Sequence, residues 1–292
     1  MSNSAAASTG GFDPLALANA AKLTKVGTRP KLGHYLKDFA QRRAFAFTLA
    51  KFNLQASTAK SSLGAAWHVV VPALQIGVYG AIFGLLLASA RPANFVPYLI
   101  TGIVLFQFIS GCFTDGAKSI TGNASLVRSL DFPRILLPVS AVVSNIMRVL
   151  PLIGLMLIGI LIFGQVPNWN WLLIVPVFVL MTLFSTGAAM ISARMTVHLE
   201  DFNQLLPFIT RVLFYSSGIF WNIDKMVPAG LLREILHNNP IHLYLVLARA
   251  SLVSGYTAEA NDWMVAAAWA VGILAFGTVW FWRAEEKYGR NV

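Results

Sequence analysis

Apolar residues gather in long runs along this chain, and shorter polar intervals separate the runs. A helix needs about 20 predominantly apolar residues to cross a bilayer. We therefore predict an all-α polytopic membrane protein with six transmembrane helices, at about 67–88, 95–113, 136–163, 171–193, 205–221 and 263–282. The fifth of these runs is short.

The N-terminal region has no long apolar run. Residues 1–33 are rich in Ala, Ser, Thr and Gly and carry basic residues, which predicts a disordered cytosolic tail and not a secretory signal. From 34 to 60, apolar side chains share one helical face, while Arg42, Arg43 and Lys51 supply positive charge. This pattern predicts an interfacial helix lying in the headgroup plane. The alternative is a soluble helix that packs on the cytosolic side.

A polar interval, GAKSITGNASLVRSLDFPRILLP at 116–138, separates the second and third apolar runs. It holds a turn at 121–123 and a short amphipathic piece at 124–130. The prolines at 133 and 138 restrict the backbone that leads into the next run. Such a segment on the basic side of a membrane suits contact with a soluble partner. An ordinary interhelical loop is the alternative.

The interval 222–262 is too long for a turn and too apolar for an ordinary hydrophilic loop. It contains two short amphipathic pieces that Asn238, Asn239 and Pro240 separate, and neither is long enough to span a membrane. We interpret them as two outer re-entrant gate helices, tolerated because protein surrounds them, with Asn239 and Pro240 as their hinge. The alternative is a small extracytoplasmic cap without a gating role.

Composition and charge support the membrane assignment. The chain is 57% hydrophobic and 12% charged, whereas soluble domains carry roughly 25% charged residues. Its net charge of +10 follows the membrane topology, because sixteen Lys and Arg lie in the termini and the intervals on their side, and four lie on the other side. By the positive-inside rule both termini are cytosolic, and we expect no nucleic-acid partner.

Motifs of catalysis and cofactor binding are incomplete. The run GCFTDGAKS at 111–119 looks like a phosphate-binding loop, but Ala117 separates Gly116 from Lys118, and a membrane span stands where the motif needs a strand. The single cysteine and the five histidines show no ligand spacing, so we predict no metal site. No clear mid-membrane carboxylate stands out, which argues against an ion-coupled carrier and a membrane enzyme.

Two arginines, Arg148 and Arg211, fall inside the predicted spans. A buried arginine is costly in hydrocarbon and normally faces the bundle interior, a cavity or a partner. Both are candidate contacts for a substrate diphosphate. The structural alternative is snorkelling or an ion pair, for example of Arg211 with Glu200 or Asp201.

Aromatic side chains are frequent in and beside the second and fifth predicted spans. If these spans line a channel, the ring faces can stack on sugars; otherwise the rings face lipid or the protein core. The candidate sugar-channel aromatics are Phe106, Phe108, Tyr215 and Phe220.

Three stretches together resemble a known family: SSLGAAWHVVVPALQ at 61–75, YLITGIVLFQFIS at 98–110 and NASLVRSLDFPRILLP at 123–138. The patterns S-x-L-G-x-x-W-x-x-x-x-P and F-P-R-x-x-L-P are similar to those of the membrane subunits of ABC-type polysaccharide exporters. The resemblance extends from about residue 35 to the C-terminus. One departure is QASTAK at 55–60, where such permeases usually carry an Arg-Tyr-Lys-like run.

The resemblance implies that residues 34–292 form an ABC-transporter transmembrane domain, working as a homodimer with two separate ATP-binding cassette subunits. ATP and Mg²⁺ would bind to that partner, so this chain would be a transport subunit without a cofactor and not an enzyme. The loop after the second span would carry the ATPase-coupling helix. Its candidate contacts are Gly122, Asn123, Leu126, Val127, Arg128 and Phe132.

The implied substrate is a polysaccharide on a polyprenyl diphosphate carrier, of the O-antigen, teichoic acid or galactan type. It would move from the cytosolic to the outer face of the bacterial plasma (inner) membrane, where this multi-pass chain lies among membrane lipids. The alternatives are a permease of the same fold for a drug or a lipid, an ion-coupled carrier, or a membrane enzyme.

Overall fold

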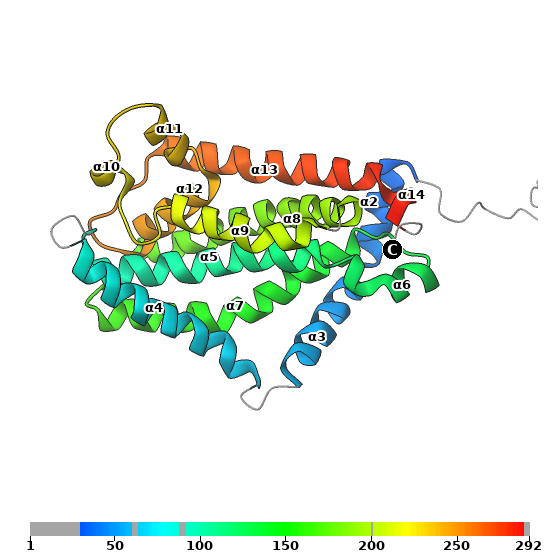
Figure 1. Cartoon of the computed structure of the whole chain (residues 1–292), viewed down its shortest axis with the longest axis horizontal. Coiled ribbons are helices and arrows are strands. Elements are labelled where there is room, and N and C mark those ends of the chain that lie inside the picture. Colours follow the sequence, from blue (N-terminus) through cyan, green and yellow to red (C-terminus); the bar gives the residue numbers. More distant parts are fainter. Residues whose placement is uncertain (1–29, 60–63, 88–91, 200, 289–292) are drawn as a thin grey trace, which may run out of the picture.

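The computed structural model describes residues 30–59, 64–87, 92–199 and 201–288. The predicted tail at 1–33 therefore lies almost entirely outside the described residues. Within them all regular secondary structure is helical, as predicted, and the longest helices run along the length of the molecule (Figure 1).

The elements follow one another in a simple order. They are α2 (Leu32–Gln41), α3 (Arg43–Ala59), η1 (Gly64–Ala66), α4 (Trp67–Leu86), α5 (Phe95–Ala117), η3 (Thr121–Asn123), α6 (Ala124–Ser129), α7 (Leu136–Ile162), η4 (Trp169–Leu173), α8 (Ile174–His198), α9 (Phe202–Ser216), α10 (Ile223–Met226), α11 (Leu231–His237), α12 (Pro240–Leu252), α13 (Ala260–Arg283) and α14 (Glu285–Tyr288).

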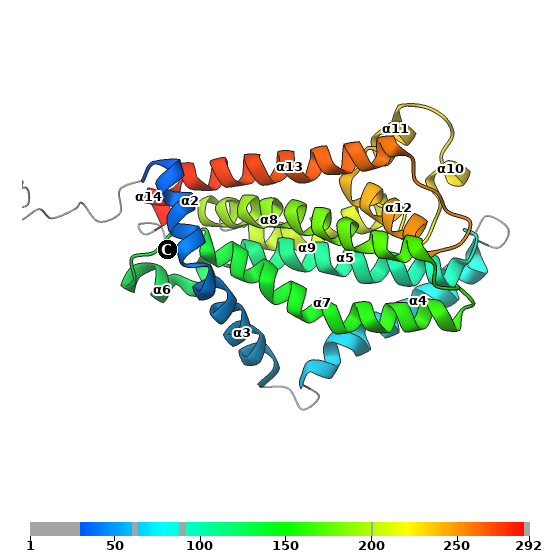
Figure 2. The same cartoon turned by 180° about the vertical axis from the view of Figure 1, so that it is seen from behind.

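Five helices in the described part of the chain are long and apolar enough to cross a membrane: α4, α5, α7, η4 with α8, and α13. They confirm the first, second, third, fourth and sixth predicted spans, although α5 and α8 each continue about one turn further than predicted. The helix α7 changes direction along its length (Figures 1 and 2) and contains Pro151. Proline removes a backbone hydrogen bond and bends a helix at such a position.

The fifth predicted span differs from the structure. The helix α9 begins at Phe202 and stops at Ser216, and Gly218 follows with a φ of +64°, a conformation that favours glycine and ends helices. The 15 residues of α9 rise about 22 Å, while the hydrocarbon core of a bilayer is about 30 Å thick. Six membrane-length helices are therefore not found in the described residues.

The chain nevertheless passes from one end of the bundle to the other along α9. Phe202 packs beside Ala117 at the end of α5. The carbonyl oxygens of Gly218 and Trp221 accept hydrogen bonds of 2.8 and 3.0 Å from the Tyr98 hydroxyl near the start of α5. The helix α9 and the non-helical residues 217–221 together extend along α5 from its end to near its start, as the predicted fifth span would.

The helix α5 lies at the centre of the bundle. In its most apolar stretch 78% of the residues are buried, against 6% in α4. It packs against α4, α7, α8, α9 and α12, so most of its surface meets protein. The apolar side chains that α4 exposes, such as Leu74 and Leu85, suit contact with lipid.

The helices α8 and α13 approach each other closely through glycine. A Cβ atom on Gly187 would overlap the backbone carbonyl of Ile273, and one on Gly277 would lie 2.5 Å from the Gly187 carbonyl oxygen. Backbones come this close only where side chains are absent. A side chain at either glycine would push the two helices apart.

The predicted interfacial helix at 34–60 is two helices, because the chain turns at Arg42 between α2 and α3. Arg42 donates a hydrogen bond of 2.8 Å to the Asp131 carbonyl oxygen, which fixes this corner beside the polar segment that follows α5. Along α3, Ala46 and Ala50 are buried, and the Ser144 hydroxyl of α7 donates to the Ala50 carbonyl at 3.0 Å. The helix α3 therefore packs on the bundle along part of its length.

The interval 222–262 forms three short helices at one end of the bundle (Figure 1). The helix α12 is buried and packs against α5, α8 and α13, which agrees with a short helix that protein surrounds. The helix α11 differs, because Leu231, Leu232 and Ile235 are exposed. The two predicted re-entrant pieces therefore differ in their surroundings: protein encloses α12, whereas α11 exposes an apolar face.

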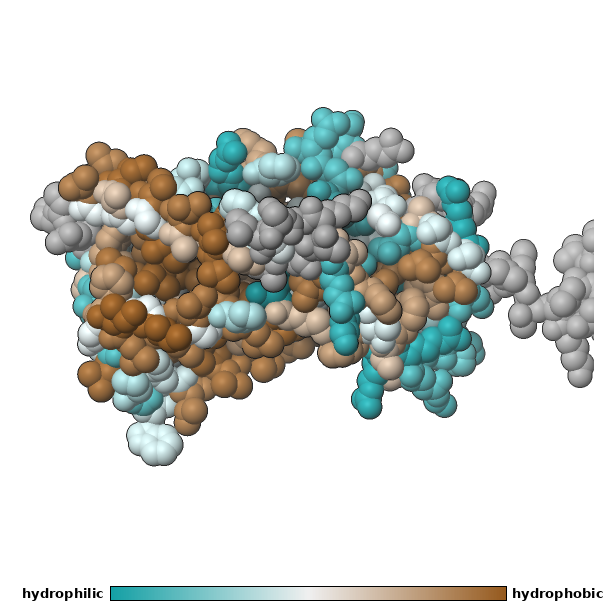
Figure 3. Space-filling view, turned by 90° about the horizontal axis from the view of Figure 1, so that it is seen from below, coloured by the Kyte–Doolittle hydropathy of each residue, from teal (hydrophilic) through white to brown (hydrophobic). Residues whose placement is uncertain are grey.

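Both ends of the described chain lie at the opposite end of the bundle, together with α6 (Figures 1 and 2). The Trp282 indole donates a hydrogen bond of 2.9 Å to the Pro30 carbonyl oxygen. Seen from below, hydrophobic side chains dominate the half of the molecule that holds α4, and hydrophilic ones are concentrated in the half that carries α6 (Figure 3). Both ends of the described chain therefore share the more polar end with the 121–132 segment.

Candidate functional site

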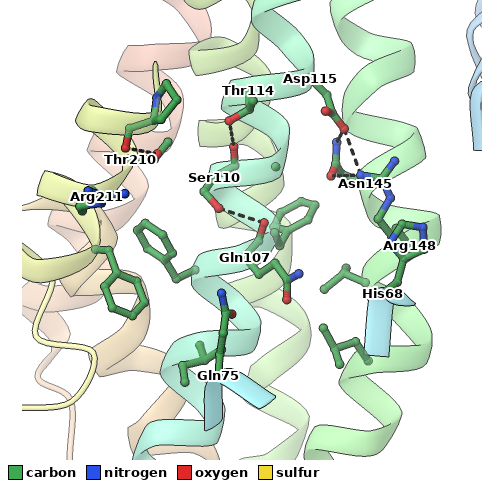
Figure 4. Close-up of a pocket in the computed structure, with 18 of the residues that line it drawn as sticks. His68, Gln75, Gln107, Ser110, Thr114, Asp115, Asn145, Arg148, Thr210 and Arg211 are labelled. Atoms are coloured by element: carbon green, nitrogen blue, oxygen red, sulfur yellow. Dashed lines mark hydrogen bonds and ion pairs between the residues drawn. The ribbon is translucent and has the colours of Figure 1, made fainter. Parts of the chain in front are cut away.

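A cavity of about 530 Å³ lies among α4, α5, α7 and α9. Each of these helices turns polar side chains toward it, although each is apolar overall. Its polar and charged lining residues are His68, Gln75, Gln107, Ser110, Thr114, Asp115, Asn145, Arg148, Thr210 and Arg211, and Figure 4 shows them around the cavity. We call this space the central cavity.

The polar lining follows from helical spacing within α5. Gln107, Ser110, Thr114 and Asp115 recur at intervals of three, four and one, which places them on one face of a helix. The hydroxyl groups satisfy backbone acceptors on the same face, since Ser110 donates to the Gln107 carbonyl at 3.3 Å and Thr114 to the Ser110 carbonyl at 2.8 Å. This buried helix therefore presents its polar face to the cavity and not to lipid.

Arg148 forms an ion pair inside the bundle. Its Nη1 lies 3.1 Å from Oδ2 of Asp115. Asn145, one turn away on α7, donates from Nδ2 to the same oxygen at 2.9 Å, and its Oδ1 accepts from Arg148 at 3.5 Å. The predicted second span, at 95–113, ends before Asp115, but the helix α5 continues beyond Asp115 to Ala117. Arg148 therefore forms an ion pair, which was the structural alternative to a substrate contact. Its partner is Asp115, which the sequence did not suggest.

Arg211 lies across the central cavity from Arg148, on α9 (Figure 4). Its side chain is exposed. The pairing considered with Asp201 is not found, and Glu200 lies outside the described residues; among those residues Arg211 forms no ion pair. The cavity therefore has one paired arginine and, within the described structure, one unpaired arginine on facing walls.

Three of the four candidate aromatics, Phe106, Phe108 and Tyr215, contribute to the lining of the central cavity. Tyr215 is 46% exposed, whereas Phe106 and Phe108 are buried. Phe220 does not line the cavity and is stacked on Phe83, with ring centroids 3.9 Å apart. Tyr215 is thus the candidate best placed to meet a ligand, and Phe220 belongs to the packing behind it.

Several lining residues were missed from the sequence. His68 and Gln75 lie seven positions apart on α4 and so share a face, a signal that the sequence does contain. Buried polar atoms without a hydrogen-bond partner in the described structure include Nε2 of His68, Oε1 of Gln107 and Nε of Arg148. Groups of this kind retain unused capacity for a ligand or for water.

A model of the ABC-2 type transporter family matches residues 45–253, which contain the whole central cavity. The chain belongs to the ABC-2 type transporter family. Among its relatives is the "O-antigen export system permease protein RfbA" of Myxococcus xanthus, 23% identical over 257 residues that make up 88% of this chain and 98% of the relative. The protein of the same name from Klebsiella pneumoniae is 25% identical over 67% of this chain and 74% of its own length.

A further relative is the "Polysialic acid transport protein KpsM" of Escherichia coli, 21% identical over 68% of this chain and 78% of its own length. These names agree with the resemblance seen in the sequence motifs. As a member of this family with five membrane-length helices in its described part, the chain is a multi-pass membrane protein.

In this ABC-2 type transporter the 121–132 segment has the predicted turn and short helix, as η3 and α6. The side chains of Val127 and Phe132 are buried within the chain, and the Phe132 ring lies 5.3 Å from that of Phe45 on α3. Val127 and Phe132 attach the 121–132 segment to the bundle, and the bundle covers their side chains. The exposed residues of the segment include Gly122, Arg128 and the half-exposed Leu130, while Asn123 and Leu126 are intermediate.

The predicted hinge of the outer helices is a helix cap in this transporter. Asn239 precedes α12, and its Oδ1 accepts from the Ile241 amide at 3.0 Å. Its Nδ2 donates to Oγ of Ser217 at 3.2 Å, which joins α12 to the end of α9. Pro240 occupies the first turn of α12, where its missing N–H costs no hydrogen bond.

A group of charged residues lies beside this cap. The Asp224 carboxylate binds the guanidinium of Arg233 and lies 3.0 Å from Nε2 of His237. Burial alone would raise the pKa of Asp224, but the hydrogen bonds from Arg233 and His237 outweigh it and lower this pKa below its ordinary value. Asp224 therefore stays ionised and links α10 to α11.

Proposed function

We propose that this chain is the membrane subunit of an ATP-driven exporter of a polysaccharide carried on polyprenyl diphosphate, of the O-antigen, teichoic acid or galactan type. The observation that carries the proposal is the central cavity of a family member whose relatives bear the names of O-antigen and polysialic acid transport proteins. Arginines on two of its walls suit a diphosphate, and Tyr215 beside them suits a sugar ring.

In the proposed export cycle, each part of the chain has its own step. The polymer would enter from the cytosolic face of the bacterial plasma membrane and leave at the outer face, past α12 and the Asn239–Pro240 cap. Two copies of the chain would form the complete passage, and a separate ATP-binding cassette subunit would press on α6 from the cytosol. The helices α2, α6 and α14 lie at one end of the bundle (Figure 2). This placement, together with the positive-inside distribution of charge, supports a cytosolic location for α6 and for both ends of the described chain.

Deletion of the encoding gene in its host, followed by complementation, tests the proposal. We expect the surface polysaccharide to fall and its lipid-linked form to accumulate inside the cell, and the intact gene to reverse both. A matched complementation with Arg211→Gln should restore much less surface polymer than one with Arg233→Gln, which changes an arginine outside the cavity. Normal surface polysaccharide in the deletion strain would contradict the proposal.

A further inference from the structure

A second cavity, of about 260 Å³, lies at the end of the bundle that carries α6. Its walls come from α3, from the residues just after α5, from the 121–132 segment and from α7. Its polar lining includes Asn53, Lys118, Ser119 and Asn123. Lys118 is exposed and gives this space a positive charge. We call it the coupling-side cavity.

The two cavities share two of their lining residues, Asp115 and Arg148. The 3.1 Å ion pair between these residues therefore stands between the central cavity and the coupling-side cavity. Asn145 belongs to the same group, because its Nδ2 donates hydrogen bonds to Oδ2 of Asp115, at 2.9 Å, and to the Ala141 carbonyl oxygen, at 2.9 Å. Figure 4 shows this group on one side of the central cavity.

The ion pair uses only part of what Arg148 can donate. One nitrogen, Nη1, contacts one oxygen of Asp115, and Nε of Arg148 is buried without a hydrogen-bond partner in the described structure. A phosphate offers several oxygens and can take two parallel hydrogen bonds from a guanidinium. A phosphate that takes the place of Asp115 on Nη1 can bond Nη2 in parallel, a contact that the Asp115 carboxylate does not make.

Hydrogen bonds also connect the end of α5, which carries Asp115, to the 121–132 segment that contains α6. Asn123 donates to the Ser119 carbonyl at 2.8 Å, and the Gly122 amide donates to the Lys118 carbonyl at 2.8 Å. Lys118 follows directly on α5 and lies three positions after Asp115. A displacement of the 121–132 segment would thus act on the end of the helix that holds one member of the ion pair.

We propose that the Asp115–Arg148 pair is a charged gate between the cytosolic side and the central cavity, and that an anionic phosphate group opens it by taking the place of Asp115 on Arg148. This inference rests on the proposed export function and names the element that admits the substrate. The phosphate would then contact three cations in turn. It would meet Lys118 in the coupling-side cavity, Arg148 at the gate and Arg211 on the far wall of the central cavity.

Cysteine labelling tests the gate without polymer or ATPase. The native Cys112 is buried and is replaced by Ser, and Thr210→Cys places one thiol in the central cavity, on the wall opposite the gate (Figure 4). Inside-out membrane vesicles present the cytosolic face to two membrane-impermeant methanethiosulfonates, one carrying a sulfonate and one a trimethylammonium group. The labelling rates of the introduced thiol are compared among four proteins: the Thr210→Cys parent, and the parent with Asp115→Asn, Arg148→Gln or the control Asp131→Asn.

We expect slow labelling of the parent by both reagents. Asp115→Asn should raise the rate of the anionic reagent by about tenfold and that of the cationic reagent much less, because it leaves an uncompensated positive charge at the gate. Arg148→Gln should show the opposite preference. The control removes a carboxylate near the same end of the molecule that lines neither cavity, and it should label like the parent.

Two results would overturn the gate. One is an unchanged rate for both reagents in both variants, and the other is an equal rise for both reagents, which would indicate looser packing and no charge selection. Should Arg148→Gln fail to accumulate, Asp115→Asn alone still decides between these results. Charge-selective labelling together with normal surface polysaccharide in the deletion strain would retain the gate and overturn the export function.

Discussion

Tyr35 and Glu285 are 250 positions apart in the chain, yet the Tyr35 hydroxyl donates a hydrogen bond of 2.7 Å to Oε2 of Glu285. The other carboxylate oxygen accepts from the Arg134 amide at 2.9 Å, and the Tyr35 oxygen accepts from the Ile135 amide at 3.1 Å. Burial and the neighbouring carboxylate raise the pKa of Tyr35, so its hydroxyl stays protonated and donates. One buried carboxylate thus joins α2, the start of α7 and α14 beside α6.

The first prediction concerns the pH dependence of stability at Glu285. Burial raises its pKa above the ordinary value of 4.5, and the donors Arg134 and Tyr35 offset part of the rise. The folded protein therefore binds this proton more tightly than the unfolded chain does. This stabilisation is complete at pH values below 4.5 and is lost as the pH rises through the folded-state pKa.

Glu285→Gln should remove this part of the pH dependence, because the amide cannot ionise, while lost hydrogen bonds cost about 1–3 kcal/mol. Thermal unfolding in detergent across the acidic and neutral range measures both effects. Glu234→Gln, an exposed carboxylate on α11, is the control. An unchanged pH slope in Glu285→Gln would show that Glu285 does not carry this proton.

The second prediction separates docking from folding in the 121–132 segment. Leu130 is 50% exposed and Val127 is 3% exposed. Leu130→Asp should reduce co-purification of the ATP-binding partner while the protein remains folded. Val127→Asp should instead lower the yield of folded protein, because a buried unpaired charge costs several kcal/mol. Leu232→Asp, at an exposed leucine on α11, is the control, and partner binding that survives Leu130→Asp would exclude this surface from the interface.

The third prediction concerns the fit of Asn145 against α5. A Cβ atom on Gly111 would overlap Oδ1 of Asn145, whereas one on Gly154 would meet no atom within 4 Å. Gly111→Ala should therefore displace Asn145 from Asp115, reduce export and destabilise the protein by about 1–3 kcal/mol. Gly154→Ala should lower neither quantity, because the new methyl group meets no atom and alanine is the better helix former. Equal behaviour of the two variants, in thermal unfolding and in surface polysaccharide, would contradict the described position of Asn145.

The fourth prediction compares the two cavity arginines. Arg211 is exposed, so Arg211→Gln should change stability by no more than about 0.5 kcal/mol while it reduces export. Arg148→Gln removes the ion-pair partner of Asp115, which then keeps, within the described structure, only the hydrogen bond from Asn145. This change should cost about 1–2 kcal/mol, less than for a fully buried pair, because the side chains of Arg148 and Asp115 are 26% and 39% exposed. Unfolding in detergent and export by the same variants measure the two effects. A large loss of stability in Arg211→Gln would assign that residue a structural role.

Much of the fold was predictable from the sequence, because membrane helices leave long apolar runs. The fifth span was misjudged where Gly218 stops α9 early, since an apolar run can continue through residues that are not helical. The break at Arg42 also depends on a distant acceptor, the Asp131 carbonyl, which no local pattern reveals.

The candidate site was predictable in part for a similar reason. Arg148 and Arg211 stand out as charges within apolar runs, and the structure places both on one cavity. Asp115, Asn145 and His68 are brought together with Arg148 only by the packing of α4, α5 and α7. Phe106 lines the cavity and Phe220 does not. Both are phenylalanines within or near predicted spans, so the sequence alone could not distinguish them.

The most direct test of the central claim is affinity purification of the tagged chain from its host in mild detergent, with identification and quantification of the proteins that accompany it. We expect a separate ATP-binding cassette subunit in equal amount, and nucleotide hydrolysis by the purified complex. A chain that purifies alone, and that supports export without such a subunit, would contradict the role of this protein as the membrane subunit of an ATP-driven exporter.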